Sequence, residues 1–289
     1  MPSFSSHPSS SILKLLLIGD SGTGKSSALA DLANAGYRLF IWDYDNGLSS
    51  LNNFLTPEGR GRVFYETLTD KLGGPKAIPI GPPDAIQRGA ALFEKWPDNL
   101  GSPRTWGERD VAVTDSITFQ GKAALRYVVS LNNRTGLPLR VNDWGDAMAV
   151  QEGWFQAFFD ASIKCNVIMT AHLKYQEPPE GGGLQVAYAS ALGSNLPPVV
   201  PRYFDHVLGT EAVGAGISTK YRLHTRRFGS MSLKTPAPSV VPAFLEAPPG
   251  KPLPLAEYFR LVKSIATQPV APATTPSQPG GLAVPTQPK

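Results

Sequence analysis

Short apolar runs bounded by glycine or by polar residues recur along the chain, with longer amphipathic stretches between them. The apolar runs predict buried strands at residues 15–18, 37–42, 62–68, 111–115, 166–170, 204–208 and 220–223. Helical periodicity predicts helices at residues 27–35, 84–96, 119–131, 146–163 and 255–265. This alternation predicts an α/β fold with a mostly parallel central sheet flanked by helices.

The predicted helix 146–163 carries one apolar face, because Val150, Trp154 and Phe158 follow one another at four-residue spacing. We expect this face to be part of the core and not a platform for stacking bases. A polar residue just before the helix, Asn142 or Asp143, is expected to cap it.

Glycine and proline concentrate in two stretches that we expect to be loops, residues 73–83 and 177–201. The second is long enough that a functional role is expected for it. The last two predicted strands are expected to form a hairpin through residues 214–216.

Composition places most of the 289 residues, 42% of them hydrophobic and 17% charged, in one sizeable domain. The Ser/Pro-rich start and the C-terminal stretch without acidic or aromatic residues are expected to be disordered. The predicted organisation is therefore a disordered segment at 1–10, a globular core at 11–235, a Pro-rich segment with a short helix at 236–265, and a disordered Pro-rich tail at 266–289.

Cys165 is the single cysteine, which excludes an internal disulfide and a multi-cysteine metal site. The apolar run 12–18 is too short to span a bilayer, and the serine-rich start has no basic region typical of a signal peptide. We therefore expect a cytoplasmic protein with no membrane partner.

The first predicted strand is followed by the sequence GDSGTGKS, which matches the phosphate-binding P-loop between a strand and a helix. Its glycines allow several backbone N–H groups to face one triphosphate at a helix N-terminus. We expect Lys25 to reach the β- and γ-phosphates of ATP and the Ser26 hydroxyl to bind Mg²⁺. The predicted nucleotide-binding residues are Gly19, Asp20, Ser21, Gly22, Thr23, Gly24, Lys25, Ser26 and Ser27.

The second predicted strand ends in the sequence DYDNG, which places Asp43 and Asp45 where ligands bind in open α/β sheets. We favour Asp45 as the residue that activates the water attacking the γ-phosphate, because it lies nearer the loop. The alternative is that these residues only form an Asx-turn.

Two other predicted strands end in polar residues. Asp115 ends the run VAVTD, where an aspartate can hold Mg²⁺ opposite Ser26. His172 follows the run NVIMT, where a side chain can sense the γ-phosphate and signal to loop 177–201. The alternative for His172 is a structural histidine.

The net charge is +4 and the isoelectric point about 9.1, which permits an anionic partner without requiring one. Two basic stretches lack any acidic residue, between Asp115 and Asp143 and between Glu211 and Glu246. Such stretches can form a groove for nucleic-acid phosphates, or can be ordinary solvated surface. The predicted DNA-binding residues are Lys122, Arg126, Arg134 and Arg140, and a guanidinium from Arg226 or Arg227 is a candidate for stabilising transition-state charge.

The order of these motifs resembles the RecA-like P-loop ATPase core, in the form that bacteriophages carry as a lone domain. GDSGTGKS matches its first nucleotide motif, VAVTDSITF its magnesium-binding strand, FIWDYDNGL its strand with the catalytic acid, and NVIMTAHL its sensor strand. Within this AAA-type group the chain is most similar to the phage Sak-type single-strand annealing ATPases. Two departures are Asp45 where recombinases have glutamate and His172 where they have glutamine.

The resemblance implies an ATP-hydrolysing, Mg²⁺-dependent protein of phage DNA recombination, with catalytic residues Lys25, Asp45, Asp115 and His172. It also implies single-stranded DNA as the partner, contacts through residues 132–142 and 177–201, and self-association into rings or filaments. A single-strand-binding protein is a further expected partner, and the location would be the host cytoplasm.

Two other functions stay open. A P-loop small-molecule kinase would hydrolyse ATP only with its acceptor, and no Arg-rich lid with kinase-like spacing is seen. An ATP-gated loader or motor would act on a protein partner recruited by the Pro-rich tail.

Overall fold

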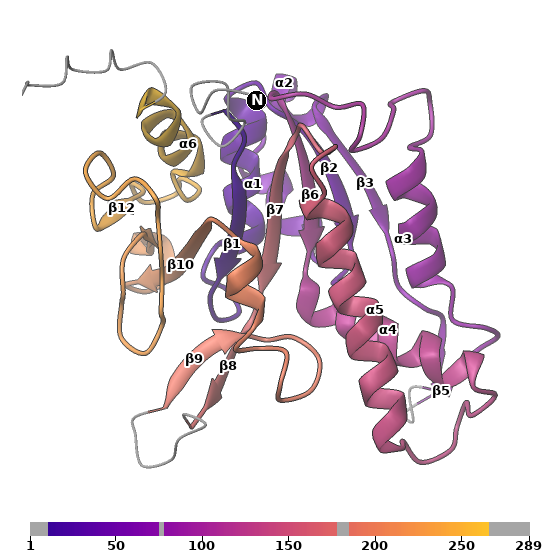
Figure 1. Ribbon diagram of the computed structural model, residues 1–289. Helices are drawn as coiled ribbons and strands as arrows, with labels where there is room; N and C mark the ends of the chain where they lie inside the picture. The colour runs from indigo at the N-terminus through magenta and orange to yellow at the C-terminus, as the bar shows by residue number, and fades with distance from the viewer. Residues whose placement is uncertain (1–10, 75–77, 178–184, 266–289) are drawn as a thin grey trace, which may run out of the picture.

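A central eight-stranded sheet organises the computed structural model, which describes residues 11–74, 78–177 and 185–265 (Figure 1). The strands lie in the order β12-β11-β10-β1-β7-β6-β2-β3. The six strands from β10 to β3 run parallel, and β11 and β12 complete the sheet in antiparallel fashion. Their bounds are β1 Lys14–Ile18, β2 Arg38–Asp43, β3 Val63–Thr67, β6 Asp110–Asp115, β7 Asn166–Ala171, β10 His206–Val213, β11 Lys220–His224 and β12 Phe244–Glu246.

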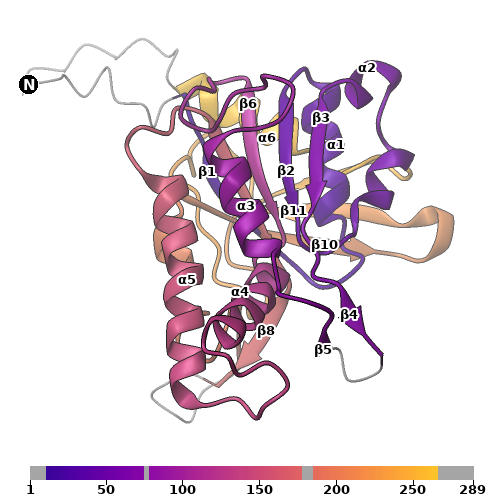
Figure 2. The ribbon, with the colours of Figure 1, turned by 90° about the vertical axis from the view of Figure 1, so that its right-hand side faces the viewer.

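Helices cover both faces of the sheet (Figures 1 and 2). They are α1 Lys25–Asn34, α2 Pro57–Arg60, α3 Ala85–Glu94, α4 Ile117–Leu131, α5 Val141–Phe159 and α6 Leu255–Ser264, with short 3₁₀ turns η3 Leu48–Asn53, η4 Val200–Tyr203 and η5 Gly216–Ser218. The central strands β1, β2, β6 and β7 are mostly apolar between their ends because both of their faces are buried, whereas the edge strands β3 and β12 are partly exposed. One core lies under α1 and α6, and the other, rich in tryptophan, lies under α3, α4 and α5.

In the strand order, β7 lies between the P-loop strand β1 and the strand β6 that ends in Asp115. The predicted α/β class, with a mostly parallel central sheet flanked by helices, is confirmed. None of the helices in the described ranges is both long and apolar enough to cross a membrane.

Three local expectations need correction. α5 begins at Val141, five residues before the predicted start at Asp146, because the Asp143 carboxylate accepts a hydrogen bond from the Arg140 backbone N at 2.7 Å and closes the first turn. The expected loop 177–201 contains strand β9, Val186–Ala189, which pairs with β8, Leu173–Gln176. The expected loop 73–83 belongs partly to a small ribbon of β4, Leu72–Gly73, and β5, Ile78–Pro79.

The predicted apolar face of α5 lies in the core, with Trp154 and Phe158 buried and Val150 half-buried. Helix α6 is packed on the core as well, since Tyr258 and Phe259 are fully buried beside α1. The segments 1–10 and 266–289, where we expect disorder, lie outside the described residues.

Candidate nucleotide site at the carboxyl edge of the sheet

The loop between β1 and α1 has the backbone that the P-loop motif requires. Gly22 and Gly24 have φ values of 79° and 91°, in the left-handed region that glycine adopts without strain. A Cβ on Gly19 would lie 2.0 Å from the Thr210 Oγ1 atom, so this position also has no room for a side chain. A Cβ on Gly24 would lie 3.1 Å from the Tyr221 ring and 3.4 Å from the Leu253 side chain.

Lys25 begins α1 and folds back over the loop. Its Nζ atom donates hydrogen bonds to the backbone oxygens of Gly19 at 2.8 Å and Asp20 at 2.7 Å. Burial lowers the pKa of Lys25, while the negative charges of Asp115, Asp45 and Asp20 oppose that shift. This ammonium group therefore lies among carboxylates at the end of the sheet.

Asp115 is buried beside the start of α1. Its Oδ1 atom accepts a hydrogen bond from Thr170, the Ser26 side chain also hydrogen-bonds to the carboxylate, and Oδ2 has no hydrogen-bond partner within the described chain. Burial raises the pKa of Asp115, and the charge of Asp45 raises it further.

An unpartnered carboxylate oxygen next to a serine hydroxyl is a donor set that suits Mg²⁺. In the described ranges no cluster of three or more His, Cys, Asp or Glu side chains can hold a metal by itself. A magnesium ion at Ser26 and Asp115 would therefore take its other ligands from triphosphate and water.

Asp45 lies just beyond β2 and contacts two neighbours. Its Oδ1 atom accepts a hydrogen bond from the Ser116 hydroxyl at 3.0 Å, and its Oδ2 atom is 3.4 Å from His172 Nε2. The His172 backbone N donates to Thr118 Oγ1 at 3.1 Å, which fixes the histidine against α4. A carboxylate paired with an imidazole can orient a water molecule and accept its proton.

Asp43 takes a different role from Asp45. Its carboxylate accepts hydrogen bonds from the Gly47 backbone N and the Thr67 hydroxyl, both at 3.3 Å. Burial raises the pKa of Asp43 to about 6, and the neighbouring charge of Asp115 adds to this shift. Asp43 thus binds the turn that follows β2 through the Gly47 backbone N, whereas Asp45 faces His172.

Neither predicted arginine joins this cluster. Arg226 donates a hydrogen bond to the Pro238 carbonyl at 2.7 Å, and Arg227 lines a hollow beside the β8–β9 hairpin with Tyr175 and Tyr188. The chain after β11 turns back toward the P-loop, since Phe228 and Met231 line a hollow with Asp20. Arg226 is nevertheless held away from the carboxylates by its bond to the Pro238 carbonyl.

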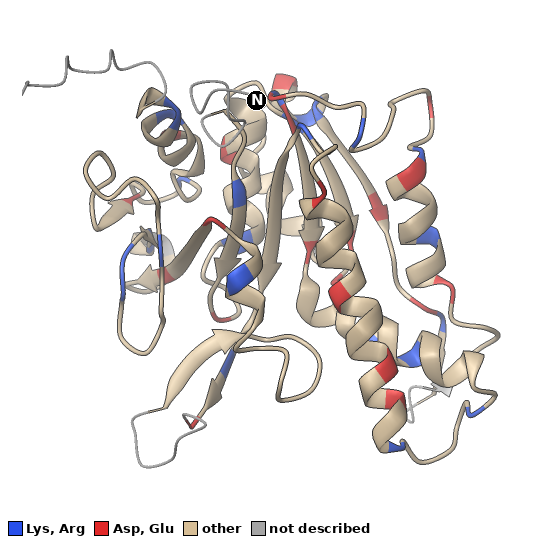
Figure 3. Cartoon of the chain, viewed as in Figure 1, with Lys and Arg blue, Asp and Glu red and all other residues tan. Residues whose placement is uncertain are grey.

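The four predicted DNA-binding residues are also divided. Arg126 forms an ion pair with Asp70 at 2.7 Å, and Arg134 forms one with Asp143 at 3.3 Å. Lys122 is exposed, with its Nζ atom 4.2 Å from the Phe119 ring centroid, and Arg140 is exposed at the start of α5. The charged positions of α4 are the basic Lys122 and Arg126, whereas those of the neighbouring α5 are the acidic Asp143, Asp146 and Glu152 (Figure 3).

Several residues at this edge do not stand out in the sequence. Thr170 and Ser116 each bind one of the site's carboxylates, and the Tyr175 hydroxyl lies 3.4 Å from Asp20 Oδ2. Thr170 ends the NVIMT run and Ser116 follows Asp115, so their positions at strand ends were the available signal. Tyr175 lies on β8, at the base of the stretch expected to be a loop.

No protein-family model matches the chain, and no curated protein matches it either. Among solved structures, it is similar to an ATPase from the type III secretion system of pathogenic bacteria (12% identity, TM-score 0.44, 69% of this chain and 52% of that one). It is also similar to the RadB recombinase (15% identity, TM-score 0.41, 74% of this chain and 80% of that one). A third similar structure is the flagellar accessory protein FlaH from Methanocaldococcus jannaschii (13% identity, TM-score 0.39, 83% of this chain and 88% of that one). The chain spans about half the length of the secretion-system ATPase.

Proposed function

We propose that this protein binds and hydrolyses ATP. The observation that carries the proposal is the convergence of Lys25, Ser26, Asp115 and the Asp45–His172 pair at one edge of the sheet, from four separate parts of the chain. The P-loop backbone and Lys25 bind the phosphates, and Lys25 must exchange its two loop carbonyls for phosphate oxygens when it does so. Magnesium, held by Ser26 and Asp115, would neutralise charge that develops on the phosphates.

Asp45 supplies the base in this proposal. Its Oδ2 atom lies beside the His172 ring nitrogen, and its Oδ1 atom accepts the Ser116 hydrogen bond. These two contacts fix the orientation of the carboxylate at the carboxyl edge of the sheet. Asp45 orients the attacking water and accepts its proton, and His172 stabilises the carboxylate position.

His172 also connects the site to the β8–β9 hairpin. Its backbone oxygen accepts a hydrogen bond from the Ser190 N at 2.7 Å, and the Thr118 hydroxyl donates to the Ser190 oxygen at 2.8 Å. A movement of His172 in response to the γ-phosphate would therefore be transmitted to the end of the hairpin. This connection supports a role in which ATP controls a polymer bound at the hairpin.

We further propose that the polymer is single-stranded DNA and that the protein is a phage annealing ATPase of the Sak type. The similarity of its four motifs to that group supports this assignment, as do the exposed Lys122 and Arg140. The proposal includes self-association, a single-strand-binding protein as partner, the host cytoplasm as location, and an ATPase core at 11–235 that β12 and α6 of the segment 236–265 complete.

The test is ATP hydrolysis by the purified full chain with single-stranded DNA, with double-stranded DNA and without polymer, at two salt concentrations. We expect stimulation by single strands that weakens as salt rises, because phosphate contacts release counterions. Hydrolysis that ignores every DNA would contradict the DNA part of the proposal and favour the kinase or protein-partner alternatives. Absence of nucleotide binding would contradict the proposal as a whole.

A further inference from the structure

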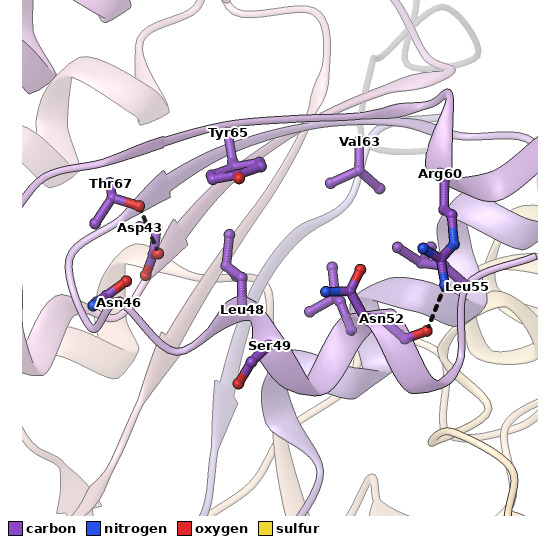
Figure 4. Close-up of a pocket in the computed structure, with 11 residues that line it drawn as sticks. Asp43, Asn46, Leu48, Ser49, Asn52, Leu55, Arg60, Val63, Tyr65 and Thr67 are labelled. Carbon is purple, nitrogen blue, oxygen red and sulfur yellow. Dashed lines mark hydrogen bonds between the residues drawn. The ribbon is translucent and has the colours of Figure 1, made fainter. Parts of the chain in front are cut away.

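A cavity of about 460 Å³ lies between the edge strand β3 and the 3₁₀ turn η3 (Figure 4). Its walls include none of the P-loop residues and neither Asp45, Asp115 nor His172. Asp43 lies at one end of this cavity, Arg60 lies at the other, and apolar side chains lie between them. The volume is in the range of small-molecule sites.

The Asp43 end carries a buried negative charge. This side chain is 1% exposed, and no ion pair of the described chain involves it. Asp43 and Asp115 are direct neighbours across β2 and β6, so their carboxylates lie on the same face and repel each other. A buried carboxylate beside a second one is stabilised by a cation, and the protein supplies none at this end of the cavity.

The opposite end carries a positive charge without an acidic partner. Arg60 donates a hydrogen bond to the Asn52 backbone oxygen at 3.0 Å and forms no ion pair within the described ranges. Leu48, Leu55 and Val63 line the space between the two ends (Figure 4). The two ends are far enough apart for an extended ligand, because a strand from Val63 to Thr67 spans roughly 13 Å at about 3.3 Å per residue.

We propose that this cavity binds a small zwitterionic organic molecule, with a protonated amine at Asp43, an apolar chain along Leu48 and Val63, and a carboxylate or phosphate at Arg60. Each part of the ligand meets a group of matching character, and the amine also meets the oxygens of Asn46 and Thr67. The proposal is independent of the ATPase assignment. It does place a bound cation next to Asp115, so occupancy of the cavity would act on the nucleotide site.

The test uses linear ω-amino acids as probes, namely 4-aminobutanoate, 6-aminohexanoate and 8-aminooctanoate, with hexylamine and hexanoate as monofunctional controls. Calorimetric titration into the full-length protein, without nucleotide, measures affinity. We expect the longer amino acids to bind at least about tenfold more tightly than either monofunctional control, because two ends are paired at once. Equal binding of hexylamine or hexanoate would overturn the zwitterion proposal, as would no binding of any probe.

Two variants locate the site. Asp43→Asn keeps the acceptor for Gly47 but removes the charge, and Arg60→Gln changes an exposed residue whose loss should not unfold the protein. Each variant is expected to lower the affinity for 6-aminohexanoate or 8-aminooctanoate about tenfold. The matched control Arg104→Gln changes an exposed arginine away from the cavity and should leave the affinity unchanged. Unchanged affinity in Arg60→Gln would overturn the proposal even if Asp43→Asn does not fold.

Discussion

The sequence suggests a function for two regions, the carboxyl edge of β1, β2, β6 and β7 and the basic segment from Lys122 to Arg140. The two regions differ in what the fold places beside their polar side chains. At the edge, polar side chains converge from distant parts of the chain, as Asp45 and His172 do across 127 residues. From Lys122 to Arg140, by contrast, two of the four basic side chains form ion pairs with acidic partners. A motif with fixed backbone spacing predicts position, whereas a run of like charges says nothing about which partners the fold brings in.

The strongest test of the edge is Lys25→Ala. Removing the ammonium that contacts the phosphates should lower ATP turnover at least about 10²-fold, because a charge stabilising the transition state is lost. Steady-state hydrolysis and nucleotide titration measure the effect. Lys95→Ala, at an exposed lysine beside α3, is the matched control and should behave as wild type. Retained turnover in Lys25→Ala would contradict the assignment of the P-loop.

Asp45→Asn separates binding from hydrolysis at the same edge. Asparagine can still accept the Ser116 hydrogen bond but cannot accept a proton, so turnover should fall about 10²-fold while ATP affinity stays within a few-fold. Asp146→Asn, at an exposed aspartate of α5, is the control. Turnover that survives Asp45→Asn would move the base to another residue.

Buried polar groups outside the edge should affect stability and leave turnover unchanged. His206 accepts or donates a hydrogen bond with the Tyr258 hydroxyl at 2.7 Å, and burial lowers the pKa of His206 from 6.5 to about 4. Between these values the unfolded chain binds a proton that the folded chain does not, so stability falls as pH drops from 6.5 toward 4. The loss attributable to His206 is about 3 kcal/mol at pH 4.

Urea unfolding of the wild type and of His206→Gln at pH 7 and pH 4.5 measures this contribution. The variant should lose less stability than the wild type over that interval, although its stability at pH 7 is lower. Equal losses in the two proteins would show that other groups account for the acid sensitivity. ATP turnover at pH 7 should be the same in both.

Arg126→Ala tests whether the ion pair with Asp70 is structural. The Asp70 side chain is 1% exposed, so its charge would be left without a cation, although the Asp84 and Ala85 N–H groups still bind it. We expect unfolding free energy to fall by about 2 kcal/mol. Lys122→Ala, one turn earlier on α4, should leave stability unchanged. A loss of DNA affinity in Arg126→Ala without a loss of stability would instead indicate that Arg126 contacts DNA.

The sequence of this chain predicts some of these features and not others. The sheet, the P-loop and the strand-end positions of Asp45, Asp115 and His172 were predictable, because periodicity and spacing fix which edge a residue reaches. The Asp70 partner of Arg126 lies 56 residues away, and nothing local signals that pairing. The orientation of Arg226 depends on its hydrogen bond to the Pro238 carbonyl, 12 residues away, and no local pattern indicates that contact.

Strand β9 and helix α6 show the same limit for packing. Glycine and proline around residues 177–201 obscured a four-residue strand whose pairing with β8 is a tertiary contact. The amphipathic pattern of α6 was visible, but its position depends on Asp31, whose carboxylate accepts a hydrogen bond from the Ala256 N at 2.7 Å across the domain. Local patterns therefore predicted elements better than their partners.

The smallest predicted effect concerns the two basic residues that the fold leaves exposed. If single-stranded DNA passes over α4 and the start of α5, Lys122→Ala and Arg140→Ala together remove two phosphate contacts. The slope of log affinity against log salt should then become shallower by about 1.4, since each contact on a single strand contributes about 0.7. Arg134→Ala is the matched control, because its guanidinium is already paired with Asp143 and should contribute little to that slope. A slope changed by Arg134→Ala and unaffected by the double variant would mean that the ion pair with Asp143 opens on binding and that the DNA contacts Arg134 instead of Lys122 and Arg140.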